Sequence, residues 1–366
     1  MATSLLNEYT HKFPAVRGMQ AGRPCYIAMC PMRLVPKLFV FDEDVVPPEL
    51  RAQRRLNESR VPDIAQYLVE NPDSYTLSAI TASVDGAVNF EPMADTGPAI
   101  NLGMLSIAMD TQILVNDGQH RRAAIEQAVK EAHELGHDNI PVLFFVDDGL
   151  ARSQQMFADL NKHAVRPSDS LSTLYDQRDG GSALARYVFD SVPCFTALTD
   201  LENNSLSKRS SKLFTLSSIK QASRALLGKT AKDRISKEEM DIAAEYWDAV
   251  CSNMRDWQDA MTRKVSTSEL REQFIHAHGI GLAALGAAGS NLIRQFPSEW
   301  KSKLSALQDI DWSRSNVKLW RGRAMDNHGK LSKTRSNTVL TANVVRRALG
   351  VSLGAEEQQV EDQLNS

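Results

Sequence analysis

Residues 113–128 constrain the fold of this chain more than any other stretch. Here a short apolar run ends in Asp-Gly and passes directly into a helical pattern. Residues 113–116 are mostly apolar, Asp117 and Gly118 make a turn, and Ile125 and Ala128 then recur at helical spacing. The stretch predicts a strand, a tight turn and a helix. The first N–H groups of such a helix have no intrahelical acceptors and lie at the positive end of its dipole. The turn is therefore suited to an anion.

The polar residues of this turn have predicted directions. Arg121 lies on the apolar side of the helix, so its guanidinium should point toward a cleft, whereas Arg122 should point outward. Gln119 and His120 cover the helix start. Asp117 ends the strand, where it could cap the helix, hold Arg121 or coordinate a metal. The alternative is a charged turn that serves only solubility.

Residues 117–121 read DGQHR, and with their context they resemble the motif of the DndB family, the DGQHR-domain proteins of DNA phosphorothioate modification systems. A strand precedes the motif, the helix begins Arg-Ala-Ala-Ile, and a second strand is expected at 140–146. More distantly, the unit is similar to the core of the ParB/sulfiredoxin superfamily, where this turn holds nucleotide phosphates. The resemblance implies either a DNA-binding regulator of the modification genes or a nucleotide hydrolase.

Two further segments resemble the family pattern. Residues 53–68 contain several arginines, which could face the motif cleft or form a solvated basic helix face. Residues 157–167 contain Asn161, which could place its side chain in the motif cleft or could only end its helix. The candidate phosphate-binding residues are Gly118, Gln119, Arg121, Arg122, Arg55, Arg60 and Asn161. The candidate catalytic residues are Asp117, His120 and Arg121.

The distribution of periodic segments predicts an α+β chain of two domains. Alternating short strands and helices predict a ParB/sulfiredoxin-like DGQHR domain over residues 1–170, and residues 171–366 are mostly helical. After an irregular lead-in at 1–22, strands are expected at 26–30, 37–41, 77–84 and 140–146. In the second domain, helices are expected at 184–192, 217–227, 237–262, 268–293 and 298–307.

Charge and cysteine content limit the functional classes. The net charge of -3 over 366 residues gives no general attraction for nucleic acid, so any such binding must come from local patches. The four cysteines form no zinc-type C-x-x-C pair and no disulfide framework, which favours a reducing cytoplasm. No apolar run reaches the roughly 18 residues that cross a bilayer, so we expect no membrane partner. No metal site is expected, and no Walker-type loop is present.

Two basic stretches in the helical half are candidates for contact with double-stranded DNA. Residues 205–229 contain no acidic side chain, and residues 314–347 contain a single one, Asp326. Their Lys, Arg, Ser and Thr side chains suit DNA phosphates, and Trp320 could stack on a base. Alternatively, Trp320 belongs to the core and the basic loops are only solvated. The candidate DNA contacts are Lys208, Arg209, Lys212, Lys220, Arg224, Arg321, Arg323, Lys330, Lys333 and Arg335.

These observations and the resemblance support three functions. The first is a DNA-binding regulator or accessory of the modification system, with the basic patches on DNA. The second is a DNA-stimulated hydrolase of a nucleoside triphosphate with Mg²⁺, in which Arg121 holds phosphate, Asp117 binds a cation or orients water, and His120 assists proton transfer. The third is an adaptor that only binds the other phosphorothioate modification proteins.

Overall fold

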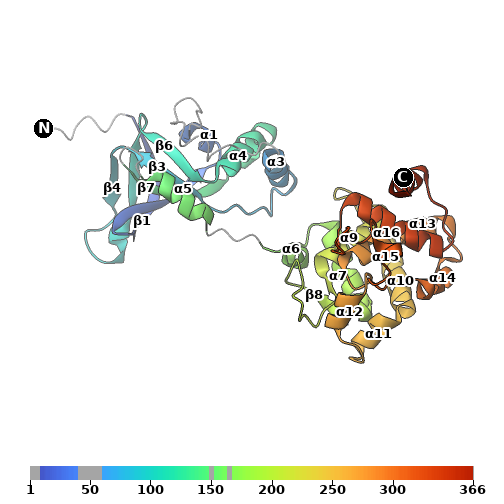
Figure 1. Ribbon diagram of the computed structural model, residues 1–366. Coiled ribbons are helices and arrows are strands. Elements are labelled where there is room, and N and C mark those ends of the chain that lie inside the picture. Colours follow the sequence, from blue (N-terminus) through green and yellow to red (C-terminus); the bar gives the residue numbers. More distant parts are fainter. Residues whose placement is uncertain (1–8, 40–59, 148–151, 163–166, 366) are drawn as a thin grey trace. The chain divides into compact units, whose positions relative to one another are not determined.

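The chain divides into two compact units, residues 1–165 and 166–366. The computed structural model describes residues 9–39, 60–147, 152–162 and 167–365 (Figure 1). Each unit has its own hydrophobic core, and strands are concentrated in the first unit and helices in the second. The chain is therefore a mixed α and β protein.

A seven-stranded sheet with the order β4-β5-β1-β2-β7-β3-β6 forms the first unit (Figure 1). All neighbouring strands are antiparallel except β3 and β7, which are parallel. The strands are β1 (Thr10–Gln20), β2 (Arg23–Pro31), β3 (Ile80–Asp85), β4 (Val88–Pro92), β5 (Leu102–Ala108), β6 (Gln112–Asp117) and β7 (Asn139–Val146). The helices are α1 (Val35–Leu38), α3 (Val61–Glu70), α4 (Gln119–Glu131) and α5 (Ser153–Lys162), with 3₁₀ turns at Pro98–Asn101 and His133–His137.

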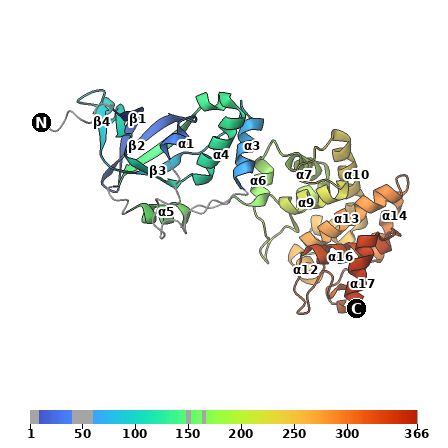
Figure 2. The same ribbon diagram turned by 90° about the horizontal axis from the view of Figure 1, so that it is seen from above.

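The strand, turn and helix predicted around residue 118 are confirmed as β6 and α4. Helix α4 buries Ala124, Ile125 and Ala128, and it packs beside α3, which buries Ala65 and Leu68 (Figure 2). Because α4 follows β6 after one residue, the polar side chains of the motif lie at the carboxyl end of a sheet strand, where ligands often bind.

Two predictions for the first unit are wrong. Residues 10–20 are not an irregular lead-in but strand β1, which pairs along its length with β2 and β5. The strands β2 and β5 come to lie beside β1 only in the folded unit, so the periodicity of residues 10–20 did not reveal this pairing. Within the segment expected as a strand at 37–41, residues 37 and 38 instead belong to helix α1, which begins at Val35 with Pro36 in its first turn. A proline fits there because its missing N–H is not needed.

The second unit is a helical assembly with one short parallel ladder, β8 (Thr199–Asp200) with β9 (Phe214–Thr215). Its first helices are α6 (Asp169–Tyr175), α7 (Gly180–Ser191), α8 (Pro193–Leu198), α9 (Leu216–Leu227), α10 (Lys237–Asn253) and α11 (Arg255–Met261). They are followed by α12 (Thr267–Gln273), α13 (Gly279–Gln295), α14 (Trp300–Lys303), a 3₁₀ turn (Leu304–Asp309), α15 (Val317–Trp320), α16 (Arg335–Ala348) and α17 (Ala355–Asn365).

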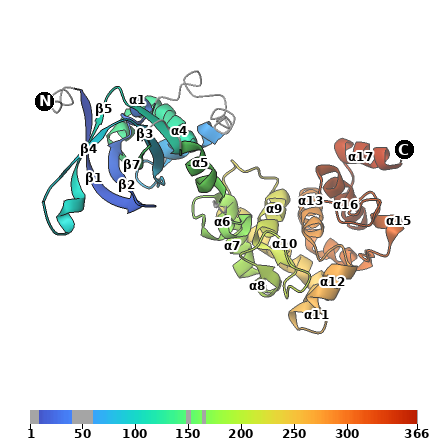
Figure 3. The ribbon, with the colours of Figure 1, turned by 60° about the vertical axis from the view of Figure 1, so that its left-hand side comes forward.

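Helix α13 is central to this unit, since it packs against both α9 and α16 (Figure 3). Gly286 permits the close approach of α9, because a Cβ at this position would lie 2.3 Å from the carbonyl oxygen of Ala222. Trp320 is fully buried and its indole N–H donates to the carbonyl of Asp311 at 2.9 Å. The core interpretation of Trp320 is thus the correct one.

Two long helices expected in this unit are each interrupted. The segment expected at 237–262 forms α10 and α11, with Met254 between them. The segment expected at 268–293 forms α12 and α13, and residues 274–278 leave the helix. In the part of the chain that the structure describes, no helix combines the length and the apolar character that a membrane crossing requires.

Candidate functional site

The motif turn has the geometry of an anion-binding helix start. Gly118 has a φ of 109°, a conformation that a side chain would strain, and it is the N-cap of α4 without any side-chain cap. The first backbone bond of the helix runs from the N–H of Arg122 to the carbonyl of Gly118 at 2.8 Å. The N–H groups of residues 119–121 therefore have no acceptor within the helix.

Arg121 is held by its own motif. Its Nη2 pairs with Asp117 Oδ2 at 2.6 Å, and its Nη1 donates to the hydroxyl of Ser78. The Nε of the same guanidinium is buried and has no hydrogen-bond acceptor. Of the roles considered for Asp117, the structure shows the one that holds Arg121. The ion pair offsets part of the charge that Arg121 would offer to an anion.

Gln119 and Arg122 support the turn from the protein side. Gln119 is 8% exposed, and its amide donates to the carbonyl of Val115 at 3.2 Å on the preceding strand. Arg122 does not point outward as expected, because its Nε donates to the carbonyl of Phe39 at 3.0 Å and its Nη2 to that of Pro36 at 3.1 Å. Both side chains therefore bind backbone carbonyls, and we leave them out of the anion site.

His120 and Arg60 complete the open side of the turn. Burial lowers the pKa of His120 below its ordinary value, and the nearby charges of Arg60 and Arg121 lower it further. A neutral imidazole at physiological pH can accept a proton. Arg55 lies outside the described residues, and Asn161 lies in α5 at a position whose side chain is not described.

In the second unit, several of the basic residues expected on DNA are bound to other protein groups. Asp179 pairs with Lys220 at 2.6 Å and with Arg224 at 2.5 Å. Burial alone would raise the pKa of Asp179, but the bonds from Lys220 and its neighbours hold it well below the usual range. Lys212 donates to the carbonyl of Ala197 at 2.7 Å. These contacts hold the three basic side chains against the protein.

Arg323 is also engaged within the unit. It makes two bonds to Glu361, from Nη1 at 2.8 Å and from Nη2 at 2.5 Å, and Glu361 is only 1% exposed. The basic residues that remain on the surface are Lys208, Arg209, Arg321, Lys330, Lys333 and Arg335.

The structure brings the two basic stretches together at α12. Arg271 of this helix donates from Nη2 to the carbonyl of Leu206 at 3.0 Å. At Gln273, the last residue of α12, the carbonyl accepts from the N–H of Arg314 at 2.7 Å, and the Nη2 of Arg314 donates to the carbonyl of Gly329 at 2.9 Å. Both basic stretches are thus hydrogen-bonded to α12, although they lie about a hundred residues apart in sequence.

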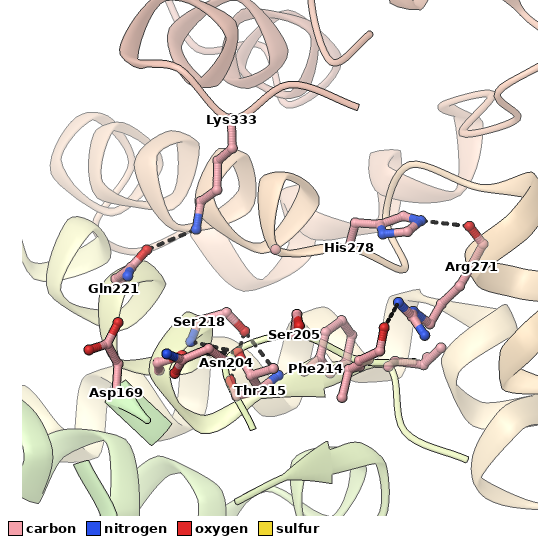
Figure 4. Close-up of a pocket in the computed structure, with 14 residues that line it drawn as sticks. Asp169, Asn204, Ser205, Phe214, Thr215, Ser218, Gln221, Arg271, His278 and Lys333 are labelled. Carbon is pink, nitrogen blue, oxygen red and sulfur yellow. Dashed lines mark hydrogen bonds between the residues drawn. The ribbon is translucent and has the colours of Figure 1, made fainter. Parts of the chain in front are cut away.

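A pocket of about 330 Å³ lies where these stretches meet (Figure 4). Its lining combines helix starts, hydroxyls and cations: Asp169, Asn204, Ser205, Leu206, Leu213, Phe214, Thr215, Ser217, Ser218, Gln221, Arg271, His278, Gly279 and Lys333. Arg271 and Gly279 were not predicted as site residues from the sequence, and Lys333 was predicted as a DNA contact. A Gly-x-Gly pair at 279 and 281 was the available signal of a helix start.

No group of three or more His, Cys, Asp or Glu side chains suited to a metal ion is found among the residues described.

Comparison with known proteins identifies the family. No curated protein and no solved structure matches the chain. The family model for DndB, described as DNA-sulfur modification-associated, matches residues 13–352. This match covers both units, including the motif turn and the pocket at α13. The chain therefore belongs to the DndB family, whose proteins are associated with the sulfur modification of DNA.

Proposed function

We propose that this protein binds double-stranded DNA through the surface around α12 and acts as a regulator of the modification genes or as an accessory of the modification proteins. One observation carries the proposal: α12 is hydrogen-bonded to two basic stretches that are distant in sequence, since Ser268 donates to the carbonyl of Lys208 and the carbonyl of Gln273 accepts from the N–H of Arg314. Cations of both stretches are exposed. Local patches of this kind supply the electrostatic part of DNA binding even when the net charge is negative.

The proposal excludes the basic residues that already have protein partners. Lys220 and Arg224 share Asp179, and Arg323 is bound to Glu361. Breaking such pairs to reach DNA would leave a partly buried carboxylate unpaired, which is costly. From the exposed basic residues that remain, the proposed contact set takes Lys208, Arg209, Lys330 and Arg335.

The test is DNA binding by the full chain, with fluorescence anisotropy on a labelled duplex over a range of salt concentrations. Replacing all four residues of the contact set by Ala should weaken binding by about tenfold or more and reduce the salt slope by about 3 to 4, at about 0.9 per lost phosphate contact. The control replaces Lys237 and Lys301, which are exposed but pair with Asp241 and Glu245. Equal affinity and slope in the two variants would refute the proposed surface.

A second assay separates the regulator from the accessory. A regulator should bind DNA from upstream of the modification genes at least about tenfold more tightly than unrelated DNA of the same length. Equal affinity for both would favour the accessory role. If the protein binds neither DNA, the adaptor function is the one that remains.

The motif turn supports a second candidate function, nucleotide hydrolysis. The start of α4, which has no side-chain cap, and the cations Arg60 and Arg121 suit the phosphates of a nucleoside triphosphate bound with Mg²⁺, and a neutral His120 could take a proton from water. The protein should then hydrolyse nucleotide in the presence of DNA, and Arg60→Ala should lower that rate. Lys130→Ala on the exposed side of α4 is the control. Absence of turnover with any nucleotide would reject this candidate.

A further inference from the structure

We infer that the pocket at the start of α13 binds a phosphoryl group, held by Lys333 and by the backbone N–H of Gly279. The pocket lies wholly within the second unit and is separate from the motif turn. Its volume of about 330 Å³ is at the small end of ligand pockets, which suits a phosphate or a small phosphorylated group.

The first argument is the position of Lys333. Its Nζ lies 3.6 Å from the place that a Cβ on Gly279 would occupy, so the ammonium is directly beside the first residue of α13. The N-terminal end of a helix carries partial positive charge, and a cation there is repelled. An anion between the two would be attracted by both. The arrangement is therefore unfavourable when the pocket is empty and favourable when it holds a phosphoryl group.

The second argument is that, among the residues that the structure describes, no carboxylate forms an ion pair with Lys333. In the described part of the chain, Lys333 donates only to the amide oxygen of Gln221 at 2.8 Å. Asp169 also lines the pocket, but it forms no ion pair with Lys333. Although Lys333 as a whole is exposed, burial of its ammonium lowers its pKa below the ordinary value. A bound anion would compensate for this lost solvation.

Arg271 adds a second uncompensated cation to the wall. Its two terminal nitrogens donate to the carbonyls of Ser207 and Leu206, and its buried Nε has no acceptor. All of its observed acceptors are neutral, so the positive charge of the guanidinium remains unpaired by acid. Two cationic side chains and the helix start thus contribute positive potential to the pocket, and Asp169 is the one carboxylate among the described residues that line it.

The third argument is the missing cap of α13. Helix α9 is capped by a reciprocal pair of bonds between Thr215 and Ser218, and α16 is capped by Thr334. The N-cap of α13 is His278, whose ring bonds instead to the carbonyl of Arg271 at 2.6 Å. The first intrahelical bond of α13 is donated by Leu282. The first N–H groups of α13 thus have no acceptor within the helix, and that of Gly279, which lines the pocket, is the one placed for a phosphoryl oxygen.

The test measures binding of inorganic phosphate and pyrophosphate to the full chain by calorimetry in a chloride buffer of low ionic strength. Lys333→Gln removes the charge and Gly279→Ala places a methyl group in the pocket at ordinary contact distance, 3.6 Å from its nearest neighbours. Both variants should weaken binding by about tenfold or more. Lys318→Gln, an exposed position in the same basic stretch, should leave the affinity unchanged. Tryptophan fluorescence confirms that each variant is folded.

A second measurement identifies the source of the phosphoryl group. If free phosphate or pyrophosphate binds and both pocket variants lose it, a small phosphorylated compound is sufficient. If free phosphates at about 10 mM do not bind but both variants weaken binding of a short duplex, the group belongs to a DNA strand. If neither variant changes any of these affinities, the inference is wrong. The small-phosphate experiment does not depend on the proposed function, because it can succeed even when the protein fails to bind DNA.

Discussion

Glu361 should be the charged residue that contributes most to the stability of the C-terminal part of the second unit. It is 1% exposed, and it accepts bonds from Arg323 at 2.5 and 2.8 Å, from Arg347 at 2.8 Å and from Asn343 at 3.1 Å. The bond from Arg323 is the largest cause that lowers the pKa of Glu361, from its ordinary 4.5 to about 2. At about 1.36 kcal/mol per pH unit, this difference corresponds to about 3 kcal/mol of stability at neutral pH.

The change Glu361→Gln keeps the size of the side chain but removes its charge, so we expect the free energy of unfolding of this unit to fall by about 3 kcal/mol. All five tryptophans lie in residues 166–366, so their fluorescence during urea unfolding reports on this unit alone. The midpoint should fall by about 1 to 2 M urea. The control is Asp362→Asn on the same helix, an exposed side chain that should change stability by about 0.5 kcal/mol or less.

The pH dependence gives an independent check of the same reasoning. The unfolded chain binds a proton at Glu361 near pH 4.5, whereas the folded chain does so only near pH 2. The stabilisation is therefore fully present above pH 4.5 and is lost as the pH falls toward 2. The native protein should lose stability more steeply over this range than Glu361→Gln. Parallel curves, or equal midpoints for the Gln variant and its control, would refute the reasoning.

Three further outcomes follow from the second unit. Gly286→Ala should lower its stability by about 1 to 3 kcal/mol, because the new Cβ would lie 2.3 Å from the carbonyl oxygen of Ala222, and an unchanged urea midpoint would contradict this packing. Asp179→Asn should cost about 1 to 3 kcal/mol without altering DNA affinity, and tighter DNA binding would show that the two cations it holds reach DNA. Burial is the main reason that the pKa of His278 is lowered from 6.5 to about 4. The free energy of unfolding of the native unit should therefore fall by about 3 kcal/mol as the pH falls from 6.5 to 4. That loss should be smaller in His278→Gln, and equal slopes in urea titrations would count against it.

The local sequence pattern was sufficient to predict the secondary structure at the centre of the first unit. The strand ending at Asp117, the turn at Gly118 and the buried face of α4 all follow from residues within about four positions of one another. Strand β1 was missed because its formation depends on β2 and β5 as neighbours on both sides. Propensity within the segment carries little information about such pairing.

The direction of side chains within the motif was predicted less well than its backbone. Helical spacing placed Arg122 on the outer face, but Pro36 of α1 and Phe39, the residue that follows α1, supply carbonyl acceptors for its guanidinium. Likewise, the count of basic residues in the second half gave no sign of Asp179 or Glu361, the acids that neutralise several of them. A charge count describes a surface only when the charges have no partner in the fold.

The break between α12 and α13 shows how a site can depend on an interaction that local sequence does not reveal. Residues 274–278 lie in a pattern that continues a helix, but the N–H of Ile275 donates to the carbonyl of Trp312 at 2.9 Å, and Phe274 bridges to Ser313. The distant segment thus provides acceptors that compete with the helix. Gly281 makes the return possible, because a Cβ there would lie 2.7 Å from the Cα of His276. Without this break, α13 would have no free first turn, and the cations around it would face a continuous helix with no open N–H groups. The same non-local bonds that interrupt the helix therefore create the proposed phosphoryl site.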